Sequence, residues 1–84
     1  MKYRLTYTER AIKDVRKLEP KVKKHIGNAL LRYEEDPLKY AVRLIESKLG
    51  TYRFRIGDYR AIFDFEDDEI VILRVGHRRD IYKR

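Results

Sequence analysis

The sequence contains no cysteine, no tryptophan and only two histidines, His25 and His77. The absence of cysteine excludes disulfides, a thiol nucleophile and thiolate metal ligands. Two histidines so far apart in the sequence do not suggest a zinc site, so we expect neither a metal nor another cofactor. No apolar run approaches the roughly 20 residues that span a bilayer, and the N-terminal segment lacks the apolar core of a signal peptide. We therefore expect a cytoplasmic protein without membrane association.

The length of 84 residues predicts a single domain, over residues 1–84. A domain of this size buries only roughly 60–65% of the surface of its extended chain, which leaves no room for a deep cavity. Any active site should be a shallow surface, and a shallow surface suits a polymer better than a small metabolite.

Positive charge is in excess, with 21 Lys and Arg against 14 Asp and Glu, a net charge of +7. Such an excess on a small surface favours a polyanion or an acidic protein as partner. The alternative is that the charge serves only solubility. Charged residues make up 42% of the chain and glutamine is absent, a composition typical of thermophiles.

The first 37 residues predict a strand followed by two helices. Residues 2–7 alternate between apolar and polar side chains, as in a strand. Thr8 is a suitable N-cap for one helix, and Pro20 suits the first turn of a second. The pair Asp36-Pro37 should end the second helix. Apolar side chains recur at helical spacing at Ala11, Ile12, Val15 and Leu18, and again at Val22, Ile26, Ala29, Leu30 and Tyr33.

From residue 51 the apolar pattern has a period of two, which predicts strands. Gly57-Asp58 is a two-residue hairpin signal, and the acidic run 66–69 predicts a second turn. Residues 70–75 should form a central strand that Gly76 interrupts. Residues 38–50 show no clean period and are interpreted as a connector with a short helical turn. The predicted fold is α+β: an N-terminal strand, a two-helix hairpin and a three-stranded antiparallel meander, with the helices packed on one face of a small sheet.

The hairpin register places arginines together. A turn at Gly57-Asp58 pairs Arg55 with Arg60 and puts Arg53 on the same face, opposite the predicted core. Like charges in directly opposed positions destabilise a sheet by roughly 0.2–1 kcal/mol. The arrangement is understandable if an anion binds there, because arginine can hold two phosphate oxygens at once. The alternative is a solvated basic face, paired with Asp64 or Glu66.

The C-terminal tail is a second basic cluster. Tyr82 could stack on an unpaired base, relay a proton, or simply fill an edge of the core. His77 could titrate near neutral pH, or it could be structural. The basic residues around them are Arg78, Arg79, Lys83 and Arg84.

Two runs resemble motifs of the RelE/ParE toxin superfamily, in its RelE-like branch: LGTYRFRIGDYRAIF at residues 49–63 and LRVGHRRDIY at residues 73–82. The resemblance implies the toxin of a type II toxin–antitoxin system, an endoribonuclease that cleaves mRNA in the ribosomal A site by 2′-hydroxyl attack. It implies a RelB-like acidic antitoxin, the ribosome and mRNA as partners, and operator DNA bound through the antitoxin.

Mapped onto this chain, the resemblance gives Arg60, Arg78 and Tyr82 as catalytic residues, with His77 as a candidate base. RNA-binding residues would be Arg53, Arg55, Arg79 and Lys83. Some members carry lysine at the positions of Arg53 and Arg55; arginine practically cannot act as a base, which disfavours that role here. Two alternatives stay open: a ParE-like gyrase poison, and a non-catalytic module that binds nucleic acid or protein.

Overall fold

A computed structural model describes residues 3–45 and 50–82 of the chain. Three helices and five strands follow one another in the order β1 (Arg4–Tyr7), α1 (Glu9–Arg16), α2 (Pro20–Tyr33), α3 (Pro37–Tyr40), β2 (Ala41–Arg43), β3 (Tyr52–Ile56), β4 (Tyr59–Glu66) and β5 (Glu69–His77).

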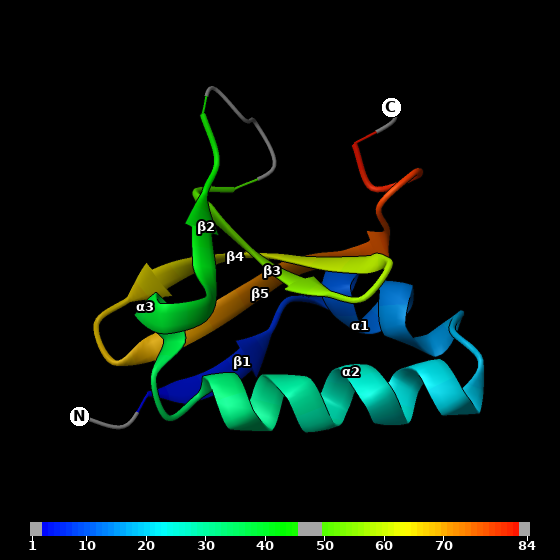
Figure 1. Cartoon of the computed structure of the whole chain (residues 1–84), viewed down its shortest axis with the longest axis horizontal. Coiled ribbons are helices and arrows are strands. Elements are labelled where there is room, and N and C mark those ends of the chain that lie inside the picture. The colour runs from blue at the N-terminus through cyan, green and yellow to red at the C-terminus, as the bar shows by residue number, and fades with distance from the viewer. Residues whose placement is uncertain (1–2, 46–49, 83–84) are drawn as a thin grey trace.

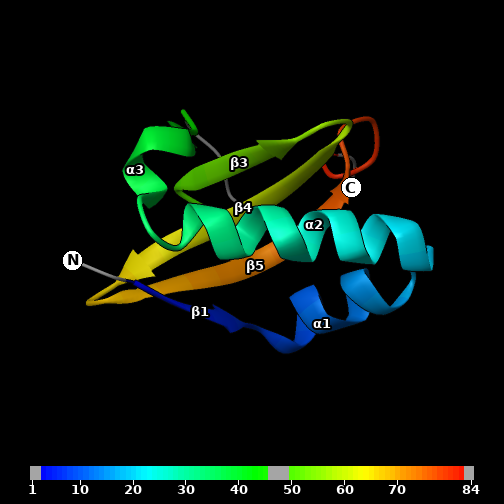
Figure 2. The ribbon, with the colours of Figure 1, turned by 60° about the horizontal axis from the view of Figure 1, so that its bottom comes forward.

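The strands form one sheet in the order β1-β5-β4-β3-β2. β1 pairs with β5 in parallel, and the other neighbours are antiparallel. Figures 1 and 2 show α1 and α2 against the same face of the sheet, so the predicted α+β fold with helices on one face is confirmed. Within the two described ranges, no helix is long and apolar enough to cross a membrane.

Aromatic side chains dominate the core between the sheet and the helices. The rings of Phe54 and Phe63 stack with centroids 4.1 Å apart, and the ring of Tyr33 from α2 lies 4.9 Å from that of Phe54. Fully burying a side chain such as Phe or Leu contributes about 1.5–3 kcal/mol. The other buried members of the core are Ala11, Ile26, Ala29, Leu30, Ile56, Ala61, Ile70, Ile72 and Val75.

Hydrogen bonds fix where α1 begins. The hydroxyl of Thr8 accepts the Ala11 N–H at 3.1 Å, which confirms the predicted N-cap. The same hydroxyl donates to the carbonyl of Leu73 at 3.2 Å. The residue that starts the helix therefore also ties it to β5. Pro20 is the first residue of α2, as predicted.

Two carboxylates hold the helices against the sheet. Asp14 of α1 accepts the Arg74 Nε at 2.8 Å and the Val75 N–H at 3.0 Å, and so covers the edge of β5 beyond the end of β1. Covering an edge in this way removes a template for unwanted strand pairing. Glu34, after α2, accepts the Leu5 N–H of β1 at 3.0 Å.

Two details of the sequence interpretation were wrong. The short helical turn expected in the connector at residues 38–50 is present as α3, but the connector also contains a strand that was not predicted. This strand, β2, has three residues, too few to reveal a period of two, and owes its conformation to pairing with β3. Gly76 does not interrupt β5, which runs to His77. Ile81 packs over this glycine: a Cβ placed at position 76 would lie 3.6 Å from the Cβ of Ile81, an ordinary van der Waals contact.

Gly57 and Gly27 form a matched pair for a stability test. Gly57 has φ +59°, so Gly57→Ala should lower the free energy of unfolding by about 1–2 kcal/mol. Gly27 lies inside α2 with open space around it, so Gly27→Ala should raise that free energy by about 0.5–1 kcal/mol. Urea unfolding measures both values, and a stable Gly57→Ala variant would contradict the turn geometry.

Candidate functional site

The β3–β4 hairpin places arginines on the face of the sheet turned away from the helices. Arg55 pairs with Arg60 and Arg53 with Ile62, the register that the sequence predicted. Gly57 has a positive φ whereas Asp58 does not, as in a type II′ turn with glycine in the first central position. A two-residue turn fixes this register, and with it the face on which each side chain lies.

The guanidinium of Arg60 folds over the turn. Its Nη1 donates to the carbonyls of Gly57 and Tyr59, both at 2.8 Å. Burial lowers the pKa of Arg60, and the positive charges of Arg55, Arg53 and Arg78 lower it further, while Tyr82 acts in the opposite direction. The surroundings of Arg60 therefore disfavour its charged form, and a bound anion would stabilise that form.

The C-terminal tail folds across this face. The N–H groups of Asp80 and Ile81 donate to the carbonyl of His77, which closes a turn directly after β5. Ile81 is 2% exposed and packs above Gly76, the partner of Arg60 in the sheet. The tail therefore lies close over the strands at this position.

Folding of the tail brings Tyr82 to the arginines. Its hydroxyl accepts a hydrogen bond from Arg53 Nη1 at 2.9 Å, although the ring remains 44% exposed. Tyr82 therefore does not fill an edge of the core. Arg53 Nε is buried and has no hydrogen-bond partner among the described residues, so this guanidinium retains an unused donor.

Arg78 reaches the same end of the sheet, where Figures 1 and 2 show the β3–β4 turn beside the C-terminal segment. Its N–H donates to the Asp58 carbonyl at 2.7 Å, and its Nε lies 3.6 Å from Asp58 Oδ1. We call the four residues Arg53, Arg55, Arg60 and Arg78 the arginine face. Sequence reasoning missed the role of Asp58, whose only signal was its position in the turn.

Of the other predicted site residues, His77 is not brought to the arginine face. His77 pairs with Tyr59, so its side chain lies on the helix side of the sheet, where the two rings are 5.4 Å apart. Its Nδ1 accepts the N–H of Arg79, an exposed residue, at 3.1 Å. The predictions of a base at His77 and of RNA contact at Arg79 stay untested, and Lys83 lies outside the described residues.

A carboxylate at the far end of the same sheet face has a different partner. Asp64 Oδ1 accepts the N–H of Thr51 at 2.6 Å. Asp64 thus fixes the backbone at Thr51, directly before β3 begins. Asp58, by contrast, pairs with the arginine face and contacts Arg78 at the margin of the cluster.

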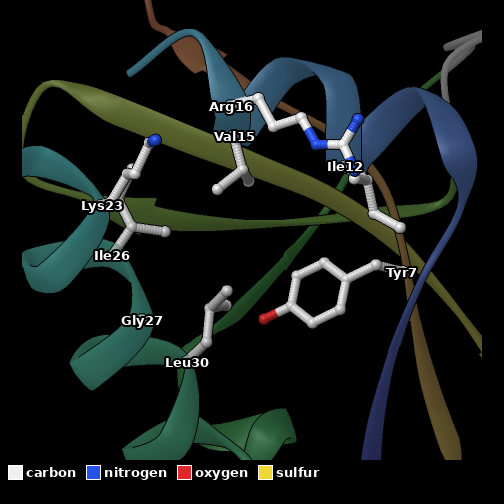
Figure 3. A pocket seen from close by; sticks show the side chains of 8 residues that line it. All are labelled: Tyr7, Ile12, Val15, Arg16, Lys23, Ile26, Gly27 and Leu30. Atoms are coloured by element: carbon white, nitrogen blue, oxygen red, sulfur yellow. The ribbon is translucent and has the colours of Figure 1, made fainter. Parts of the chain in front are cut away.

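A second surface feature is an apolar groove of about 240 Å³ between α1, α2 and the end of β1. Figure 3 shows Val15, Ile26 and Leu30 inside it and Arg16 and Lys23 beside it. Its remaining lining residues are Tyr7, Ile12 and Gly27. Burial raises the pKa of the Tyr7 hydroxyl, and the negative charge of Glu34 raises it further. The groove combines an exposed apolar surface with positive charge.

Comparison with known proteins defines the class. The family model of the ParE toxin of the type II toxin–antitoxin system parDE matches residues 5–82. The chain therefore belongs to this toxin family, within the RelE/ParE superfamily, and the resemblance found in the sequence is confirmed.

Individual relatives include RelE toxins. The chain is 34% identical to toxin RelG of Mycobacterium tuberculosis over the full length of both proteins. It is also similar to a chain of the RelBE2 toxin–antitoxin complex of the same species, at 30% identity and a TM-score of 0.84, covering 93% of this chain and 100% of the other. An archaeal RelE–RelB complex from Pyrococcus horikoshii OT3 contains a chain with 25% identity and a TM-score of 0.72, covering 95% of this chain and 99% of the other.

Reversing one charge of the arginine face should separate stability from binding. In Arg55→Glu the new carboxylate lies opposite Arg60, so the free energy of unfolding should rise by roughly 0.2–1 kcal/mol at low salt. Affinity for a short RNA should fall at the same time. Lys24→Glu on α2 makes the same change in net charge and should leave RNA affinity nearly unchanged. Chemical unfolding and fluorescence anisotropy measure the two effects; equal losses of affinity would contradict a localised site.

Proposed function

We propose that this toxin is a ribosome-dependent endoribonuclease that inhibits translation by cleaving mRNA in the A site. The observation that carries the proposal is the arginine face with the Tyr82 hydroxyl 2.9 Å from Arg53. A cluster of four arginines on a shallow surface suits the phosphates of a polymer. The relatives named RelG and RelE support the same reading.

The chemistry requires no group beyond RNA, side chains and solvent water. The 2′-hydroxyl gives up its proton to water as its oxygen attacks the adjacent phosphorus, the bond from phosphorus to the 5′-oxygen breaks, and a 2′,3′-cyclic phosphate and a 5′-hydroxyl result. Arg60 and Arg78 would stabilise the negative charge that develops on the phosphate oxygens. Arg53 and Arg55 would hold the neighbouring backbone in register.

Tyr82 is the better placed candidate for proton transfer. Its oxygen already accepts a hydrogen bond from Arg53, so its own O–H proton is available to a second partner. In this proposal that partner is the departing 5′-oxygen, and Tyr82 acts as a general acid. His77 is less well placed, because its ring lies on the opposite side of the sheet with Tyr59.

The ribosome would supply what this surface lacks. In-line attack needs the 2′-oxygen, the phosphorus and the 5′-oxygen in one line. Correct alignment lowers the activation free energy by several kcal/mol, about 7–11 in favourable cases. The arginine face supplies positive charge, but it is a shallow surface and does not enclose the RNA. A message already held in the A site would arrive with its backbone constrained, so free RNA should be cleaved weakly or not at all.

Primer extension on a defined message in a translating extract tests the proposal. The toxin should produce cuts within A-site codons, and these should disappear without ribosomes. An Arg60→Ala, Arg78→Ala double variant should lose at least about 100-fold in cleavage rate, because two donors to the developing charge are removed.

The matched control is Lys24→Ala, Arg32→Ala, which removes two exposed charges from α2 and should cleave normally. No cuts by folded, antitoxin-free toxin would contradict the proposal. Inhibition of gyrase supercoiling would then support the second candidate, a gyrase poison, which the ParE family match favours. Salt-dependent RNA binding alone would support a non-catalytic module.

We also propose an acidic, RelB-like antitoxin as partner, with operator DNA bound through that antitoxin. The relatives occur in toxin–antitoxin complexes, and a net charge of +7 would speed association with an acidic protein. The groove between α1 and α2 suits an apolar segment flanked by acidic residues, because Arg16 and Lys23 stand beside its apolar lining.

A charge in the groove should weaken antitoxin binding. Ile12 lines the groove and is 41% exposed, so Ile12→Asp should raise the Kd for the cognate antitoxin at least about tenfold. Leu31→Asp introduces the same charge at an exposed position of α2 outside the groove and should bind normally. Calorimetric titration gives both constants, and equal constants would exclude the groove as the contact.

A further inference from the structure

One turn organises both proposed phosphate ligands. The β3–β4 turn consists of Gly57 and Asp58, and each contacts an arginine that follows later in the chain. The Gly57 carbonyl accepts from Arg60 at 2.8 Å, and the Asp58 carbonyl accepts the Arg78 N–H at 2.7 Å. The turn thus contacts the arginine of β4 and the arginine of the tail together.

Arg78 depends on this contact more than its neighbours do. Arg53, Arg55 and Arg60 belong to paired strands, whereas Arg78 follows the last residue of β5. Its side chain is 52% exposed, and a long side chain on such a segment has many rotamers. The Asp58 carboxylate, 3.6 Å from Nε, limits the directions in which the guanidinium can point.

The presence of Asp58 needs a reason, because its charge opposes the proposed ligand. A carboxylate beside a phosphate site repels the phosphate. The ion pair also contributes little to stability, since the two side chains are 52% and 71% exposed and exposed pairs are worth about 0–1 kcal/mol. The turn favours a short polar residue at position 58, but Asn would serve there as well as Asp. Orientation of Arg78 accounts for the negative charge itself.

We infer that Asp58 is a positioning residue that aims the Arg78 guanidinium at the scissile phosphate. The inference rests on the proposed ribonuclease function. Because the carboxylate repels RNA while it orients Arg78, its loss should affect binding and turnover in opposite directions. A residue that only supported the fold would lower both.

The test is single-turnover cleavage of mRNA on programmed ribosomes by wild-type toxin and Asp58→Asn. Asparagine is tolerated in turns, so the hairpin should be preserved. The rate at saturating toxin should fall about 10- to 100-fold, as expected for a misplaced catalytic group. The toxin concentration for half-maximal rate should stay equal or decrease. Asp67→Asn, in the turn between β4 and β5, makes the same change in charge and should cleave as the wild type does.

A double-mutant cycle separates positioning from an independent effect. If Asp58 acts through Arg78, adding Asp58→Asn to Arg78→Ala should lower the saturating rate no further. Additive losses would overturn the positioning role, and so would a normal rate for Asp58→Asn. A parallel loss in Asp67→Asn would do the same. Absence of cleavage by the wild type would instead overturn the proposed function, and the inference with it.

Discussion

Repulsion among arginines is the constraint on which the site depends. The register of the β3–β4 hairpin places Arg55 opposite Arg60, and the fold brings Arg53 and Arg78 close enough to lower the pKa of Arg60. A sheet selected for stability alone would carry opposite charges at such positions. The cluster therefore lowers the stability of the sheet, and the proposed binding of an anion would account for it. A core of stacked aromatic rings stabilises the other face.

The tail completes the site through a contact that involves no charge. Ile81 is buried above Gly76, and this apolar contact directs the last described residues across the strands. As a result Tyr82 meets Arg53, and Arg78 meets Asp58 in the hairpin turn. Ile81 lies over Gly76 at van der Waals distance from where a Cβ would stand. The glycine that looks like a strand breaker in the sequence thus lies within β5, directly beneath the tail.

The sequence predicts those features that local rules determine. Gly57-Asp58 specifies a turn type, the turn specifies a register, and the register places Arg55 opposite Arg60. Features that depend on distant partners were missed or misassigned. β2 is a strand because β3 lies beside it, and the face on which His77 lies follows from its pairing with Tyr59. Neither relation has a signal within a few residues, so periodicity could not reveal it.

The central claim is that this surface cleaves RNA by orienting the message's own 2′-hydroxyl. The most direct measurement uses a message with a single 2′-deoxynucleotide on the 5′ side of the scissile phosphate, bound to ribosomes and treated with the toxin. The account predicts that the cut at this phosphate disappears, while neighbouring ribonucleotide sites remain cleavable and yield 5′-hydroxyl ends. Cleavage that persists at the deoxy position would contradict it, because the nucleophile would then have to come from elsewhere.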